Sequence, residues 1–190
     1  MDKRSQIARV ITEISAPWLS NIVLFLTLGL ALDAVPAGLG AALFTGVLPM
    51  VAIVWMQRRG QVSDHHVTKA QQRSRVFLII AVLLGILCLY LALVDTPREI
   101  WVIFAAAVVF IAVYAFITKV IGIKLSVHVG LWVCVYGFLA ISLSSWWFLA
   151  VAATPLVWWS RIKLAHHTNK EAGLGFLVGF VLLVVASISV

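Results

Sequence analysis

A polar segment near the C-terminus, residues 160–171, carries the side chains best suited to chemistry in this sequence. It reads Ser-Arg-Ile-Lys-Leu-Ala-His-His-Thr-Asn-Lys-Glu and separates two strongly apolar stretches. The guanidinium group of Arg161 offers a rigid fork of donors that fits phosphate oxygens. If the segment runs directly into a helix, His167 and Glu171 lie four residues apart on one face. A carboxylate placed there holds one imidazole nitrogen and leaves the other free as a base or nucleophile.

The other histidines lie in two further polar connections. His65 and His66 belong to the longest polar segment, residues 57–75, which also contains Lys69 and Arg73. His128 follows Ser126 at the start of a later apolar run, and His166 precedes His167. If the chain crosses a membrane seven times, all five histidines lie on one side of it. The sequence therefore predicts a polar cluster at one membrane surface.

The order of these motifs resembles the three signatures of the type 2 phosphatidic acid phosphatase family. Ser160-Arg161, five residues, His167, three residues and Glu171 are similar to the third signature, which has Asp in place of Glu171. Ser126-Val127-His128 keeps the Ser and the His of the second signature, Pro-Ser-Gly-His.

The first signature of the family is Lys, six residues and Arg-Pro. Arg73 matches its Arg, His66 stands at the position of its Lys, and Ser74 follows where the family has Pro. Lys69 lies one turn before Arg73 and can supply an ammonium group. The resemblance covers about 105 residues, counted from the first signature to the last.

The resemblance implies a role for each matching residue. His167 would attack phosphorus, Glu171 would orient it, and His128 would protonate the leaving oxygen. The implied phosphate-binding residues are Arg161, Arg73, Lys69, His66, Ser126 and Ser160. Cations of this kind stabilise charge on phosphate oxygens, so the reaction needs no cofactor. No Asp, Glu and His residues have the sequence spacing of a zinc or magnesium site, and we expect no metal.

The composition indicates a membrane protein. The chain has 190 residues, of which 63% are hydrophobic and 11% charged. The net charge of +7 comes from basic residues in short connections, where they set topology and contact anionic headgroups. We therefore expect membrane lipids rather than nucleic acid as the contacts of these residues; the sequence identifies no protein partner. Cys88 and Cys134 lie inside apolar runs and form neither a metal-binding nor a disulfide pattern.

The chain divides into an interfacial segment, residues 1–16, and a membrane-embedded phosphatase-like domain, residues 17–190. Ile7, Val10, Ile11 and Ile14 give the first segment the spacing of an amphipathic surface helix. Seven apolar runs follow, and we expect an all-α integral membrane protein with a single bundle of about six to seven transmembrane helices. The fifth and sixth runs are the least secure, and Pro155 is expected to kink the sixth. The runs are 17–32, 38–56, 76–94, 100–118, 127–141, 146–159 and 172–190.

The basic residues also predict orientation. With seven spans, thirteen of the fourteen Lys and Arg residues fall on the side of the histidines, and only Arg98 falls on the other. Without Lys69, Arg73, Arg75 and Arg161, which chemistry could explain, the balance is still nine to one. The positive-inside rule then places the site on the cytoplasmic face. We expect the membrane to be the plasma membrane of a prokaryote.

Three other readings stay open. Paired histidines suggest a membrane haem or electron-transfer protein, although axial ligands usually project from facing helices rather than from connections. A transporter is a second reading, but no acidic residue lies at the centre of an apolar run. A non-catalytic relative of the phosphatases is the third. The expected substrate is a lipid phosphate or diphosphate of polyprenyl or diacylglycerol type, because the headgroup lies at the membrane surface.

Overall fold

The computed structural model describes residues 2–190, which form helices joined by short connections and contain no strand. The all-α architecture expected from the sequence is confirmed. The elements are α1 (Lys3–Ile14), α2 (Pro17–Ala31), α3 (Val35–Ala42), η1 (Leu43–Val47), α4 (Leu48–Arg58), α5 (Ala70–Leu93), α6 (Arg98–Phe116), η2 (Ile117–Ile121), α7 (Val127–Ser142), η3 (Ser145–Trp147), α8 (Phe148–Ala152), α9 (Thr154–Lys163) and α10 (Asn169–Ser187).

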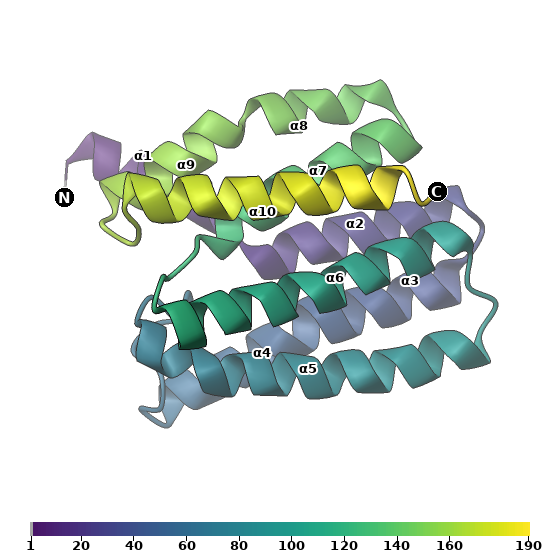
Figure 1. Cartoon of the computed structure of the whole chain (residues 1–190), viewed down its shortest axis with the longest axis horizontal. Coiled ribbons are helices and arrows are strands. Elements are labelled where there is room, and N and C mark those ends of the chain that lie inside the picture. Colours follow the sequence, from purple (N-terminus) through teal and green to yellow (C-terminus); the bar gives the residue numbers. More distant parts are fainter. Residues whose placement is uncertain (1) are drawn as a thin grey trace.

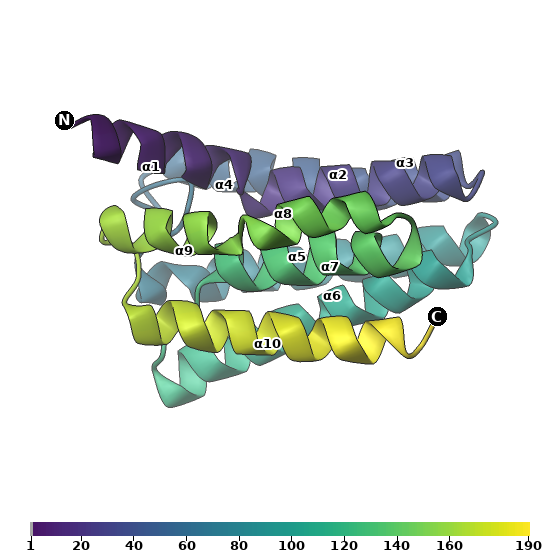
Figure 2. The ribbon, with the colours of Figure 1, turned by 90° about the horizontal axis from the view of Figure 1, so that it is seen from above.

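The helices run side by side along the long axis of the molecule (Figure 1, Figure 2). The connections 59–69, 122–126 and 164–168 meet at one end, where α1 also lies (Figure 1). The connections 32–34 and 94–97 and the C-terminus lie at the opposite end (Figure 1). The bundle thus gathers the three connections that carry or border the histidines at a single end.

Four helical stretches are long and apolar enough to span a membrane, namely Val35–Arg58, Ala70–Leu93, Arg98–Ile121 and Asn169–Ile188. The pair α1 and α2, bent by 41° at a short break, would together make a fifth. Helix α7 is apolar but shorter than these four. These lengths and compositions fit a membrane-embedded protein, whereas the expected number of six to seven spans is not confirmed.

Helix α1 has the amphipathic character expected of residues 1–16. Ile7 and Val10 are more than half exposed, at 54% and 58%, on the face turned away from the bundle. Ala8 and Thr12 are buried on the opposite face, which packs against α9. An exposed apolar stripe of this kind is the face that an interfacial helix presents to lipid.

Helix α7 is the centre of the bundle, although its sequence was among the least secure predictions. Its residues from His128 to Ala140 are all buried, and it packs against α2, α8, α9 and α10. A helix that is apolar on every side needs neighbours on every side. Neighbouring helices therefore cover most of the surface of α7.

Glycines let α7 and α10 approach until their backbones touch. A Cβ atom added to Gly179 would meet the backbone of Gly130, and one added to Gly175 would come within 2.6 Å of the Ser126 carbonyl oxygen. Backbone atoms cannot move away as a flexible side chain can. The close contact therefore requires glycine at these positions.

We expect Gly179→Ala to lower the free energy of unfolding by about 1–3 kcal/mol, because the methyl group overpacks a backbone contact. Gly85→Ala is the matched control, since nothing lies within 4 Å of the added Cβ on the exposed face of α5. The control should instead be neutral or stabilise by about 0.5–1 kcal/mol. Thermal unfolding of both variants in one detergent tests this, and equal shifts would contradict the packing argument.

Proline breaks the second apolar run inside the bundle. Pro49 has no N–H group to donate to the carbonyl of Thr45, and the chain forms the π-helical turn η1 just before it. The side-chain amide of Asn21 donates to that carbonyl at 3.0 Å. The sixth run is also interrupted, as Pro155 predicted, and α8 and α9 meet at Ala153.

Candidate active site

Four of the five histidines form one cluster at the end of the bundle that carries α1. The ring of His66 lies at its centre, with centroid distances of 4.0 Å to His65, 5.1 Å to His128 and 5.9 Å to His166. These rings come from two connections and the first turn of α7. The sequence prediction that the histidines share one face agrees with this geometry.

His167 lies beside this cluster, and its two ring nitrogens have different surroundings. Nδ1 lies 3.1 Å from the backbone carbonyl of Lys124 and 3.4 Å from Oε2 of Glu171. Nε2 is buried and has no hydrogen-bond partner among the described residues. If Nδ1 carries the proton and donates it to the Lys124 carbonyl, Nε2 keeps a free lone pair. This is the arrangement that a nucleophilic histidine requires.

His167 pairs with Glu171 as expected, but it lies outside the helix rather than on its face. His167 lies one residue before Thr168, which is the N-cap of α10. Glu171 reaches back through a capping box: its Oε2 accepts from the Thr168 N–H at 2.8 Å, and the Glu171 N–H donates to Thr168 Oγ1. The backbone N–H groups of His166 and His167 both donate to the Arg161 carbonyl. A turn and a cap, rather than helical periodicity, therefore bring His167 and Glu171 together.

The imidazole of His167 is kept neutral by its surroundings. Burial, followed by the positive charges of Arg73, Arg161 and Lys124, lowers the pKa of His167 to about 2. Burial and Arg161 likewise lower the pKa of His166 to about 4. A neutral ring retains the lone pair that a nucleophile uses, so this position favours attack over proton donation at neutral pH.

Arg161 is a buried cation with few partners. Its side chain is 1% exposed in the last turn of α9. Its Nε and Nη1 atoms have no hydrogen-bond partner in the described part of the chain. A buried guanidinium group is costly unless an anion and hydrogen bonds compensate it. The arrangement therefore suits an anion, and the planar donor fork matches phosphate geometry.

Unpartnered polar atoms are concentrated around this point. Among residues 2–190, the buried side-chain nitrogen and oxygen atoms without a partner number ten, and six of them belong to the cluster or to residues beside it. The six are Ser126 Oγ, His128 Nε2, Arg161 Nε, Arg161 Nη1, His166 Nδ1 and His167 Nε2. Native interiors pair nearly all such groups, so this concentration makes the region a candidate ligand site.

Ser126 and His128 reach the cluster from the start of α7. Ser126 is fully buried at the N-cap, and its backbone N–H donates to the Glu171 carbonyl at 3.1 Å. The Tyr114 hydroxyl donates to the Ser126 carbonyl at 3.3 Å or to the Gly175 carbonyl at 3.1 Å. This backbone junction sets His128 and His167 in a fixed relation to each other.

Arg73 has a different environment from Arg161. It is 5% exposed; its Nε donates to the Val67 carbonyl at 3.1 Å and its Nη1 to the Leu125 carbonyl at 2.8 Å. Arg73 therefore ties the 59–69 connection to the one that precedes α7, and it adds positive charge near His167. Lys69, expected beside it, is exposed, and among residues 2–190 no side-chain hydrogen bond or ion pair of Lys69 is found.

Ser160, also expected to bind phosphate, contributes to helix packing. It is fully buried; its hydroxyl donates to the Val157 carbonyl at 2.7 Å and accepts from Thr12 of α1 at 3.1 Å. The hydroxyl of Ser160 is therefore engaged in contacts within α9 and between α9 and α1. Of the two residues Ser160 and Arg161, only Arg161 faces the cluster.

Sequence reasoning missed two residues that organise the site. Lys124 donates from Nζ to the His166 carbonyl at 2.6 Å and supplies the carbonyl that holds His167. Asp64 accepts from the backbone N–H groups of His66 and Thr68 and from the Thr68 hydroxyl. The sequence carries a weak signal for Asp64, because an Asp side chain commonly accepts a hydrogen bond from the backbone N–H two residues later, here that of His66. Nothing in the sequence singles out Lys124 from the other basic residues.

A cavity of about 140 Å³ adjoins the cluster at His65, His66, Arg73 and His128. It continues between α2, α4, α5, α6 and α7, and apolar side chains form most of its wall. Those from α5 and α6 are Val76, Phe77, Ile80, Leu84, Ala107, Phe110 and Ile111. A wall with polar side chains beside the cluster and apolar side chains elsewhere suits an amphiphilic ligand.

Comparisons with protein-family models, with curated proteins and with solved structures find no match to this chain. The resemblance to the type 2 phosphatidic acid phosphatases therefore depends on its sequence motifs alone.

Proposed function

We propose that this protein is an integral membrane phosphatase that hydrolyses a lipid phosphate or diphosphate through a phosphohistidine intermediate. The arrangement of His167 carries the proposal: Lys124 and Glu171 hold Nδ1, and Nε2 is free close to the buried Arg161. A neutral, oriented imidazole beside an unpaired guanidinium group is suited to attack on a phosphate.

In the first step, the lone pair of His167 Nε2 forms a bond to phosphorus, and the bond from phosphorus to the leaving oxygen breaks. His128 gives a proton to that oxygen. The negative charge of the bound phosphate favours the protonated form of His128 before reaction. Arg161 stabilises the charge on the equatorial oxygens, and Glu171 stabilises the positive charge that develops on His167.

In the second step, water attacks phosphorus from the side that the leaving group has vacated. His128, now neutral, takes the proton from this water. The bond between phosphorus and Nε2 breaks, and the electron pair returns to His167. Phosphate then leaves, and both histidines are back in their starting states, with His128 protonated and His167 neutral.

Two observations favour a lipid rather than a soluble substrate. The cluster lies at one end of a bundle of apolar helices, where a lipid headgroup would lie. The adjoining cavity extends from polar residues into an apolar interior and could take the first part of a lipid tail.

The test is phosphate release by the purified protein from a panel that contains phosphatidic acid, a polyprenyl phosphate, a polyprenyl diphosphate and a soluble phenyl phosphate. We expect release from at least one lipid and much less from the soluble ester. Activity should survive EDTA, because no step of the reaction uses a metal. Complete loss with EDTA that Mg²⁺ restores would refute the phosphohistidine route. A protein that binds the lipids without turnover would be a non-catalytic relative.

We further propose that the bundle crosses the membrane seven times, with the cluster on the cytoplasmic face. The crossings would be α2, α3 with α4, α5, α6, α7, α8 with α9, and α10. The excess of basic residues at the end that carries the cluster supports this orientation. We also propose that this membrane is the plasma membrane of a prokaryotic cell.

Cysteine labelling tests this topology in a background in which Cys88 and Cys134 are replaced by serine. Ser63→Cys and Thr168→Cys, both exposed at the cluster end, should resist an impermeant thiol reagent in intact cells. Asp33→Cys, exposed at the opposite end, is the matched control and should react. Labelling of both Ser63→Cys and Thr168→Cys would reverse the orientation, and labelling of only one would contradict the fold.

A further inference from the structure

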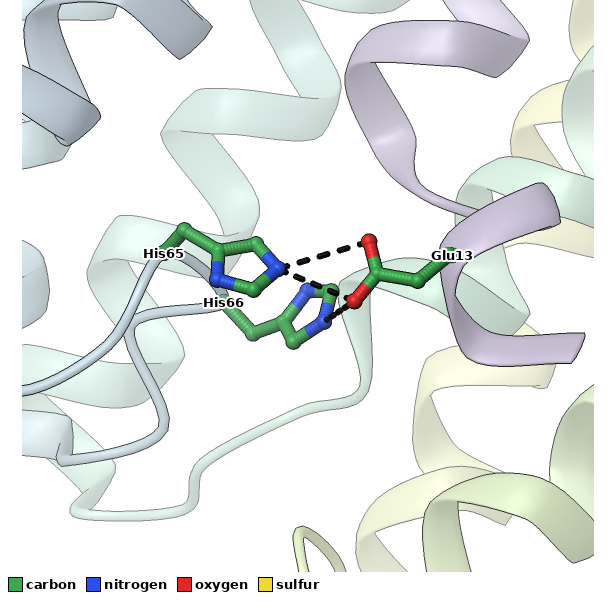
Figure 3. A group of neighbouring side chains, drawn as sticks. All are labelled: Glu13, His65 and His66. Carbon is green, nitrogen blue, oxygen red and sulfur yellow. Dashed lines mark hydrogen bonds and ion pairs between the residues drawn. The ribbon is translucent and has the colours of Figure 1, made fainter. Parts of the chain in front are cut away.

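A second set of side chains meets at the edge of the cluster, where α1 passes the 59–69 connection. Oε1 of Glu13 lies 3.0 Å from Nε2 of His65 and 3.1 Å from Nε2 of His66 (Figure 3). Oε2 of Glu13 lies 3.4 Å from the same atom of His65. One carboxylate thus faces two imidazole nitrogens that come from a connection 52 residues away.

The connection holds both histidines in fixed positions. Asp64 accepts from the Ser63 hydroxyl and from the backbone N–H of His66, both at 3.0 Å. The backbone of Val67 has a positive φ of 48°, and its carbonyl accepts from Arg73. Hydrogen bonds on both sides therefore fix the turn that carries the two rings. Ligands on a fixed backbone bind a metal ion more tightly than ligands on a mobile one.

The three groups are close enough together to bind one tetrahedral ion. Zinc binds imidazole nitrogen at about 2.0–2.1 Å and carboxylate oxygen at about 2.0–2.2 Å, which puts neighbouring ligand atoms about 3.3 Å apart. The ligand atoms of Glu13, His65 and His66 all lie within 4.8 Å of one another. Two imidazoles and one carboxylate are a ligand set that zinc uses in proteins, with water in the fourth position.

We propose that Glu13, His65 and His66 form a binding site for a divalent transition-metal ion, with Zn²⁺ as the ion that fits best. Each imidazole would coordinate through the lone pair of Nε2 and carry its proton on Nδ1. The ion would join helix α1 to the 59–69 connection. The site is reachable from the aqueous end of the bundle, since the side chains of Glu13 and His65 are 52% and 32% exposed.

The metal site does not depend on the proposed phosphoryl transfer, although the family resemblance also implies a phosphate-binding role for one of its members, His66. The reacting atoms belong to His128, Arg161 and His167, and none of these residues is a member of the metal set. Metal binding is therefore measured directly, and its outcome can be told apart from that of phosphate release.

The experiment uses the full chain in detergent, stripped with EDTA and then freed of the chelator. Zn²⁺ is titrated by calorimetry, and Co²⁺ is followed by its visible absorption, which reports four-coordinate geometry. We expect one ion per chain. Glu13→Gln, which keeps a hydrogen-bond acceptor but loses the charge, should weaken Zn²⁺ binding at least about tenfold, and His65→Ala should weaken it by more than that.

Two matched controls separate this site from general binding to acidic residues and histidines. Glu99→Gln removes an acid at the opposite end of the bundle, and His166→Ala removes a histidine of the cluster that is outside the metal set. Both should bind Zn²⁺ as the unmodified chain does. Zn²⁺ should raise the melting temperature of the unmodified chain and both controls, and raise it far less for Glu13→Gln.

Three results would overturn the proposal. The first is no stoichiometric Zn²⁺ or Co²⁺ binding, which would leave Glu13 as an acceptor of two N–H···O bonds. The second is undiminished binding in both Glu13→Gln and His65→Ala. The third is equal weakening in these variants and in the controls, which would indicate nonspecific association.

Discussion

His167→Ala is expected to abolish phosphate release from a lipid substrate, with a loss of about 10³-fold or more, because the covalent route has no substitute for that imidazole. Lys124 and Glu171 contact Nδ1 of this ring, and its buried Nε2 atom has no hydrogen-bond partner among the described residues. The measurement is steady-state phosphate release, combined with a search for acid-labile phosphate on the protein after rapid quenching.

His166→Ala is the matched control for the adjacent position and should retain substantial activity. The backbone contacts of His166 do not need its side chain: its N–H donates to the Arg161 carbonyl, and its carbonyl accepts from Lys124. Glu171→Gln should give an intermediate rate, because the Lys124 carbonyl still orients Nδ1 after the charge is lost. An essential His166 with a dispensable His167 would refute the assignment.

Arg161→Met is expected to change activity and stability in opposite directions. The substitution should lower kcat/KM by about 10²–10³-fold, because it removes the guanidinium group proposed to stabilise the transferring phosphoryl group. It should raise the free energy of unfolding without substrate by on the order of 1 kcal/mol, because Nε and Nη1 are buried without partners.

Arg73→Met is the control for this pair of effects. Arg73 is equally buried, but it donates to the carbonyls of Val67 and Leu125, so its loss should lower the melting temperature. Inorganic phosphate should stabilise the unmodified chain against heat and should not stabilise Arg161→Met. A destabilised Arg161→Met protein that still responds to phosphate would contradict the role given to Arg161.

The sequence predicts much of the helical framework because apolar runs and proline act locally. The amphipathic pattern of residues 1–16, the break near Pro155 and the grouping of the histidines all appear in the structure. Burial of α7 on every side could not be predicted, because a short apolar run has the same pattern whether lipid or other helices cover it.

The sequence motifs predict which residue types gather at the candidate site, but not which of them keep free polar atoms there. Arg161, His128 and His167 carry unpartnered atoms in the cluster, whereas Ser160 and Arg73 have the same types as phosphate ligands but make hydrogen bonds within the fold. Glu13 gives no sequence signal, because its histidine partners lie in another segment and meet it only through packing of α1.

The groups proposed to react and the apolar cavity are carried largely by different helices around α7. Arg161 lies in α9, Glu171 in α10 and His167 in the connection between them, whereas the cavity is lined mainly by α2, α4, α5 and α6 and reaches the start of α7 at His128. In the proposed phosphatase, substitutions in the wall formed by α5 and α6 could therefore alter which lipid chain fits while Arg161, His167 and Glu171 stay in place. Such a bundle could change its substrate through one group of helices and keep its reaction in another.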